Sequence, residues 1–309
     1  MTRLTRRRFL TIAAACMALP ARASGPEIAH WRGRALGASA SMKLVGVSPA
    51  QGEAIFAEVE QELARLEAIF SLYQPTSEIS RLNRDGSLPA PSADLLNVLS
   101  LCTALHDASG GAFDPTIQPL WFALANGAQS PEIDVARSTI GWDQLRFDTS
   151  RVWFTGPSRG QAITLNGIAQ GAITDRIAAL LKARGLRNVL IDMGEIVAMG
   201  SRTDAIGWAA GIADPDGIVQ HRLTLKDQAL ATSSPHGTRI GPQRDQPHII
   251  APKGTRETRS IVSVSAPYAA LADGLSTALC LVGSEVREAA LARFPQARIE
   301  FETLTATDS

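Results

Sequence analysis

The chain carries a pair of oxygen-bearing side chains whose spacing suits a hard metal ion. Asp273 and Thr277 lie four residues apart in "ALADGLSTAL" (270–279), within an Ala/Leu-rich run. Positions i and i+4 share one face of a helix, so a carboxylate and a hydroxyl would project side by side. Oxygen ligands of this kind bind Mg²⁺ and Ca²⁺. The spacing also fits a solvated stripe, or a threonine bonded to a carbonyl of its own helix.

Two glycine-containing segments favour a ligand that approaches the backbone. "LNGIAQGAITD" (165–175) places Gly167 and Gly171 at the start of a predicted helix, and a helix N-terminus favours phosphate. "GGAFDPTIQPLW" (110–121) sets Asp114 before a proline. That turn either exposes N–H groups to an anion or serves only as a turn. Neither segment matches G-x-G-x-x-G.

Nucleophilic and zinc chemistry have weaker support. "ATSSPHGT" (231–238) offers a serine with His236 or His248 as base, but no G-x-S-x-G pattern surrounds it. The remaining histidines are interpreted as structural. No H-E-x-x-H or paired-cysteine motif indicates zinc.

Hydrophobic periodicity predicts the elements that must position these residues. Helices are expected over 48–73, 92–109, 171–185, 268–283 and 285–294. Strands are expected over 186–194, 207–215, 221–234, 247–252 and 259–267. Helices come early and strands cluster late. This order predicts an α+β fold with a mixed or largely antiparallel sheet core flanked by helices.

The N-terminal residues 1–23 are typical of an export signal. A basic start precedes an apolar run beginning at Phe9, and an A-x-A site ends at Ala23. The run is shorter than the about 20 residues that span a bilayer. Arg6-Arg7-x-Phe9-Leu10 fits the twin-arginine pattern, which predicts a periplasmic protein. A general secretory signal and a lipid anchor are the alternatives. Residues 24–309 are expected to form a single domain.

Charge and cysteine content bound the function further. The 30 basic and 30 acidic side chains balance, and removal of 1–23 leaves a net charge of about −5. Without a basic stripe, nucleic acid is not an expected partner. Cys16, Cys102 and Cys280 are the three cysteines. The first follows three alanines and is weakly similar to a lipoprotein cleavage site. The other two lie in apolar helical patterns and are expected in the core, with a disulfide between them left open.

Six ordered blocks together resemble a known family. They are "FSLYQPTSEISRLN", "GGAFDPTIQPL", "LNGIAQGAITDRIAALLKARGLRNVLIDMGE", "LATSS", "HIIAP" and "VSVSAPYAALADGLSTALCLVG". Over about residues 31–283 the chain resembles the ApbE family of FAD:protein FMN transferases. The resemblance implies an ApbE-like fold that binds FAD and Mg²⁺, cleaves the pyrophosphate and releases AMP. FMN would pass to a threonine or serine hydroxyl of a client flavoprotein.

The resemblance also assigns residues by position. It places the metal ligands at the Asp273 carboxylate, the Thr277 hydroxyl and the Gly167 carbonyl, with Ser276 as an additional ligand. The implied flavin and FAD contacts are Tyr73, Ala112, Phe113, Asp114, Thr164, Gln170 and Ile250. One carboxylate ligand from the protein is sufficient, because Mg²⁺ takes other ligands from water and substrate phosphates. His248 is our candidate base for the acceptor hydroxyl, and positioning or flavin contact would explain it equally well.

Five places depart from the family pattern, the first being Leu36-Gly37-Ala38, which stands where the family has Met-Gly-Thr. Gln170 replaces a lysine, Glu195 the second glycine of Asp-x-Gly-Gly, Ser234 the glycine of Thr-Ser-Gly and Ala251 an aspartate. "DMGE" and "ATSSP" look like a subgroup associated with maturation of nitrous oxide reductase. That likeness implies a client that is a membrane-bound electron-transfer flavoprotein facing the periplasm.

Two rival functions use the same residues differently. With water as acceptor, the site would be an FAD pyrophosphatase that yields FMN and AMP. Without catalysis, the protein would be a flavin carrier or maturation factor, a reading motivated by Gln170 and Ala251. Intact Asp273 and Thr277 favour catalysis, since flavin storage needs no hard metal.

Overall fold

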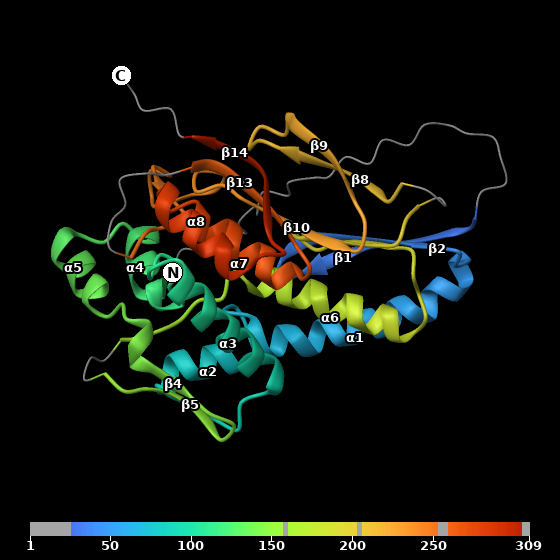
Figure 1. The fold of residues 1–309 in the computed structure, drawn as a ribbon. Coiled ribbons are helices and arrows are strands. Elements are labelled where there is room, and N and C mark those ends of the chain that lie inside the picture. The colour runs from blue at the N-terminus through green and yellow to red at the C-terminus, as the bar shows by residue number, and fades with distance from the viewer. Residues whose placement is uncertain (1–25, 157–159, 203–205, 253–258, 305–309) are drawn as a thin grey trace.

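A seven-stranded antiparallel sheet forms the centre of the molecule (Figure 1). The computed structural model describes residues 26–156, 160–202, 206–252 and 259–304, so the predicted signal at 1–23 lies outside them. In sheet order the strands are β1 (Ile28–Ala35), β2 (Ala38–Val45), β6 (Val189–Asp192), β7 (Ile196–Met199), β10 (Gln228–Ser233), β13 (Arg259–Ala266) and β14 (Arg298–Leu304). Every neighbouring pair is antiparallel. With the helices, this sheet confirms the predicted α+β class.

One face of the sheet is covered by helices. The α-helices are α1 (Pro49–Phe70), α2 (Glu78–Asp85), α3 (Ala93–Ala108), α4 (Gln118–Ala125), α5 (Ser130–Ser138), α6 (Ala169–Ala183), α7 (Ala269–Leu279) and α8 (Ser284–Arg293). Figure 1 shows α1 and α6 side by side beneath the strands. Met42 and Ile191 from the sheet join Leu66 of α1 and Ile177 of α6 in the main core. In the described ranges, no helix combines the length and hydropathy needed to cross a membrane.

The opposite face carries a β-hairpin with its own core. Strands β8 (Trp208–Ala213) and β9 (Val219–Leu225) pair with each other, and Trp208 packs with Leu190 and Leu230 of the main sheet. Since side chains alternate along a strand, Leu190 and Ile191 point to opposite faces of the sheet. The smaller sheets comprise β3 (Ser87–Pro89), β5 (Arg151–Phe154) and β4 (Leu145–Phe147), and β11 (Arg239–Ile240) with β12 (Gln246–Pro247).

The strand predictions were wrong in three respects. The segment 221–234 is not one strand, because Asp227 takes a left-handed φ of 52° and separates β9 from β10, which lie in different sheets. The strand predicted over 247–252 ends at Pro247, and His248 begins irregular backbone. Strands also come first in the described part of the chain, since β1 and β2 precede α1.

Helix α7, which carries the predicted metal ligands, is fixed directly against α6. The Asp175 carboxylate accepts the backbone N–H groups of Ala269 (2.7 Å) and Ala270 (2.9 Å). These N–H groups have no partner inside their own helix, so an acid from α6 caps α7. At Gly171, an added Cβ would lie 2.4 Å from the Ala269 carbonyl oxygen. The two helices therefore meet backbone to backbone.

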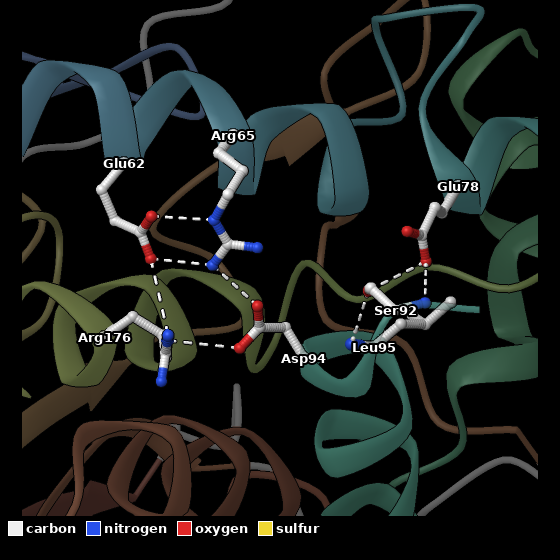
Figure 2. Close-up of polar contacts among 7 residues, drawn as sticks. All are labelled: Glu62, Arg65, Glu78, Ser92, Asp94, Leu95 and Arg176. Atoms are coloured by element: carbon white, nitrogen blue, oxygen red, sulfur yellow. Dashed lines mark hydrogen bonds and ion pairs between the residues drawn. The ribbon is translucent and has the colours of Figure 1, made fainter. Parts of the chain in front are cut away.

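Ion pairs tie α6 to the helices beside it (Figure 2). Arg65 of α1 contacts Glu62 and, across the helix boundary, Asp94 of α3, each at 2.7 Å. Arg176 of α6 lies 3.2 Å from Asp94 and 3.7 Å from Glu62. Exposed pairs contribute about 0.2–1 kcal/mol each, so this network aligns three helices more than it stabilises them.

A second contact in Figure 2 joins α2 to α3. The Glu78 carboxylate accepts both the backbone N–H and the hydroxyl of Ser92, at 3.0 Å each. The Ser92 hydroxyl in turn accepts the Leu95 N–H and caps α3. Cys102 of α3 and Cys280 beyond α7 are buried and free, so no disulfide joins them.

Candidate active site

A cavity of about 220 Å³ opens where the start of α6, the middle of α7 and three loops meet. Ten of the twelve predicted base, metal-ligand and FAD-contact residues line it: Ala112, Phe113, Asp114, Thr164, Gly167, Gln170, His248, Ile250, Asp273 and Thr277. Two do not. Tyr73 follows the end of α1 and is 64% exposed, whereas Ser276 is fully buried behind the cavity wall. Positions spread over some 160 residues of sequence thus face one space.

Asp273 is the most constrained of these side chains. It is 4% exposed, and its Oδ2 accepts the Gly171 N–H at 3.1 Å. Burial raises the pKa of Asp273 to about 7, and the charge of Asp175 adds to the shift. A carboxylate removed from water binds either a proton or a cation. Its burial also shows that the interpretation of a solvated stripe was wrong.

Thr277 and Gly167 complete a set of hard oxygen donors beside Asp273. A Cβ added at Gly167 would lie 3.0 Å from the Thr277 hydroxyl oxygen, so that backbone runs directly against the threonine. The hydroxyl lies 3.2 Å from the Ser233 hydroxyl. Ser276 contacts the same Ser233 hydroxyl at 2.8 Å and donates to the Asp273 carbonyl. The described residues contain no group of three or more His, Cys, Asp or Glu side chains that suits a metal.

The ring of His248 is held in one orientation. Its Nδ1 lies 3.0 Å from the carbonyl oxygens of Pro235 and Thr238. Since carbonyls only accept, Nδ1 carries the hydrogen and Nε2 keeps its lone pair. The Trp121 indole donates to the His248 carbonyl at 3.1 Å. Burial lowers the pKa of His248 below its usual 6.5, so the imidazole is neutral near pH 7 and suited to accept a proton.

The loop that contains Asp114 is braced by its own hydrogen bonds. The Asp114 Oδ1 accepts the N–H and the hydroxyl of Thr116, at 2.8 and 2.6 Å. The Thr164 N–H donates to the Pro115 carbonyl at 2.8 Å, which holds the two predicted FAD-contact segments side by side. On the far wall, Gln170 donates to the Met193 carbonyl at 3.1 Å. The walls are therefore preformed rather than loose.

The structure reveals buried polar groups that the sequence indicated only as departures from the family or as a weakly supported base. Within the described ranges, the buried atoms without a hydrogen-bond partner include Glu195 Oε2, Ser234 Oγ and His236 Nδ1. Glu195 and Ser234 line the cavity. Burial, followed by the charges of Asp273 and Asp192, raises the pKa of Glu195. Because the Ser234 hydroxyl has no hydrogen-bonded base there, an activated serine is not formed.

Other lining residues gave little signal in the sequence. Ser39, Trp121, Asn166 and Ser233 also face the cavity. Trp121 ends the quoted 110–121 segment, and Asn166 lies within the 165–175 segment. For Trp121 and Asn166, the position inside these segments was the sequence signal that could have identified them. No spacing rule could have selected Ser39, which lies at the start of β2.

Together, the fold and the site define an α+β protein with a ligand cavity that presents hard oxygen donors and a neutral imidazole. The ApbE family model matches residues 36–300 of the chain. The chain therefore belongs to the ApbE family, which confirms the resemblance inferred from the six sequence blocks.

Similar proteins cover most of the chain. The FAD:protein FMN transferase of Haemophilus influenzae is 27% identical over 306 residues, covering 89% of this chain and 87% of the relative. That of Treponema pallidum is 29% identical and covers 75% of each. The solved flavin transferase ApbE from Vibrio cholerae shares the fold, with a TM-score of 0.77 and 23% identity over 91% of this chain and 98% of that one. Pseudomonas stutzeri flavinyl transferase ApbE, in its apo form, has a TM-score of 0.73 and 26% identity over 86% and 88%.

Proposed function

We propose that this chain transfers FMN from FAD to a serine or threonine hydroxyl of a client protein and releases AMP. The observation that carries the proposal is that Asp273, Thr277 and His248 line one cavity. Membership of the ApbE family and relatives named FAD:protein FMN transferase support the same reaction. In the transfer, the hydroxyl oxygen bonds to the FMN phosphorus, the bond to AMP breaks and the hydroxyl proton moves to a base.

The oxygen donors fit a hard divalent cation, for which we propose Mg²⁺. Asp273 would supply charge, Thr277 a hydroxyl and Gly167 a carbonyl, and the Asp273 carboxyl is buried with one backbone donor. When bound, the cation would offset the negative charge that develops on the pyrophosphate oxygens. The protein holds Asp273 in place through the Gly171 N–H and through the capped start of α7.

His248 is the proposed base for the acceptor hydroxyl. Its Nδ1 is turned to two carbonyls, which leaves Nε2 as the basic nitrogen. The lowered pKa keeps that nitrogen unprotonated at neutral pH. Ala112, Phe113, Asp114 and Ile250 line the cavity and would contact FAD, whereas Tyr73 is exposed and would contact the flavin only outside the cavity.

The client and the cellular compartment extend the proposal. The predicted twin-arginine signal at 1–23 supports a periplasmic enzyme. The client would then be a membrane-bound electron-transfer protein whose acceptor serine or threonine lies on the periplasmic side. The "DMGE" and "ATSSP" segments support a client linked to nitrous oxide reductase maturation.

The test is a mass spectrum of a candidate client domain after incubation with chain 24–309, FAD and Mg²⁺. A mass gain equal to covalent FMN, absent when EDTA is added, is the expected result. Free FMN and AMP without modified client would instead identify a pyrophosphatase. Bound and unchanged FAD would identify a carrier, and either outcome would overturn the transferase.

A further inference from the structure

Glu195 lies in the tight turn between β6 and β7. Gly194, with φ of +98°, allows the chain to reverse, and the Met193 N–H donates to the Glu195 carbonyl at 3.0 Å. The next residue, Ile196, belongs to the apolar cluster under the β8–β9 hairpin. Because side chains alternate between faces, Glu195 is directed to the opposite face, toward the cavity that it lines.

The carboxyl of Glu195 is incompletely satisfied. The residue is 7% exposed, and the backbone N–H of Thr232 donates to the carboxyl. Its Oε2 has no hydrogen-bond partner within the described ranges. A buried polar atom without a partner costs about 1–3 kcal/mol, more when it is charged. An unsatisfied oxygen in a ligand cavity therefore points to a ligand as its partner.

The surroundings of this oxygen are negative. Asp273 lines the same cavity, and both Asp273 and Asp192 raise the pKa of Glu195. No lysine or arginine is found among the described residues that line the cavity. The neighbouring Gln170 is neutral, and its side chain occupies the space that a Cβ at Gly194 would need. With Asp114, three acids line the cavity, and without a lining lysine or arginine they attract a small divalent ion.

We propose that Glu195 supplies a second carboxylate to the cation site of Asp273, Thr277 and Gly167, so that the protein binds a divalent cation before FAD. This inference rests on the proposed function, because it concerns the same cation. A site with one carboxylate depends on substrate phosphates to hold Mg²⁺, whereas a second carboxylate allows the protein alone to retain it.

The experiment is a titration of chain 24–309 with Mn²⁺, without FAD, in which free Mn²⁺ is followed by its electron paramagnetic resonance signal. Glu195→Gln keeps the side-chain shape and removes the charge, so affinity should fall about 10- to 100-fold. Asp192→Asn is the matched control. It alters an acid of the same hairpin that lies on the other face beside β8, and affinity should change by at most about threefold.

A third variant, Asp273→Asn, separates the two levels of the proposal. Loss of Mn²⁺ binding in Asp273→Asn with wild-type affinity in Glu195→Gln would overturn only the role of Glu195. Wild-type Mn²⁺ affinity in Asp273→Asn would refute the proposed cation site as a whole. Equal losses of Mn²⁺ affinity in Glu195→Gln and Asp192→Asn would also overturn the role of Glu195 as a cation ligand. If thermal melting shows that Glu195→Gln does not fold, Glu195→Gly, which has the family's residue, repeats the test.

Discussion

Asp273 is held where an ionised carboxyl is costly. It is almost fully buried and receives one backbone hydrogen bond, from Gly171. Burial raises the pKa of Asp273 to about 7, so near neutral pH a proton and a cation compete for it. Strongly shifted groups in a cavity are typical of functional sites. The same burial explains why one carboxylate can dominate the site, since its charge is poorly screened by water.

Asp273→Ala is expected to lower Mg²⁺-dependent FMN transfer by more than about 100-fold, because the only charged member of the proposed ligand set besides Glu195 is lost. The rate of client mass gain measures the effect. Thermal melting should show that the fold is retained, because removal of a costly buried charge offsets the loss of the acceptor for the Gly171 N–H. Asp192→Asn serves as the control. Transfer at the wild-type rate by Asp273→Ala would refute the assignment.

His248→Gln should reduce kcat for transfer about 100- to 10,000-fold while FAD binding persists, because it removes a base and leaves a side chain of similar reach. At saturating Mg²⁺, which keeps Asp273 ionised, wild-type activity should fall only below pH 6.5, because burial lowers the pKa of His248 and the imidazole gains its proton there. A pH profile of kcat/KM measures this acidic limb. His221→Gln, which alters a ring stacked on Phe301, is the control. An acidic limb that persists unchanged in His248→Gln would exclude the role.

At the scale of elements, the joint between α6 and α7 determines where the proposed metal ligands lie. Gly171 lies in the first turn of α6 and Gly167 just before that helix, whereas Asp273 and Thr277 belong to α7. Close backbone packing at Gly171 and the capping bonds from Asp175 set the distance between the two helices. The ion-pair network of Figure 2 then holds α6 against α1 and α3. The geometry of the site is therefore a property of two helices packed together.

Gly171→Ala should destabilise the fold by about 1–3 kcal/mol, because its Cβ would lie 2.4 Å from backbone that cannot turn aside. Alanine favours helix by about 1 kcal/mol over glycine, which offsets part of the loss. Urea unfolding measures the difference. Ala179→Gly, at an exposed position of α6, is the control that measures the difference in helix propensity between alanine and glycine alone. A Gly171→Ala variant more stable than wild type would contradict the close packing.

Asp175→Asn should change how stability depends on pH. Burial raises the pKa of Asp175 to about 6, above about 3.9 in the unfolded chain. The folded protein binds the extra proton between these values, so this group stabilises the fold as pH falls through 6. Relative to wild type, the unfolding free energy of Asp175→Asn should therefore rise by about 1 kcal/mol from pH 5 to pH 7. Chemical denaturation at both values measures it, and a difference independent of pH would contradict the shift.

For the whole molecule, the prediction concerns where the chain functions. Arg6→Lys combined with Arg7→Lys keeps the charge of the N-terminus and removes the twin-arginine pattern. The full-length variant should then remain in the cytoplasm, and a periplasmic client should stay unmodified. Cell fractionation and the client mass measure both effects. Undiminished periplasmic enzyme would indicate a general secretory signal instead.

The predicted elements were most accurate where the pattern was local and repeated. The expected helices over 92–109 and 171–185 correspond to α3 and α6 within two residues, because apolar spacing and flanking glycines define them. The hairpin β1–β2 and the break at Asp227 were missed. Their strands are fixed by pairing with strands elsewhere in the chain: β2 pairs with β6, and β10 pairs with β7 and β13. The segment after Pro247 looked like a strand because its residues are β-branched, yet it lines the cavity.

The sequence by itself determined the family, the chemical types of the proposed ligands and the shared helical face of Asp273 and Thr277, since these depend on residue identity and on i,i+4 spacing. Only the tertiary structure decided that Asp273 is buried, that Asp175 caps its helix and that Glu195 carries an unsatisfied oxygen. Burial and pairing depend on residues that are distant in the chain and are brought together by packing. The spacing thus specified the donors, and the packing of α6, α7 and the β6–β7 turn specified their environment.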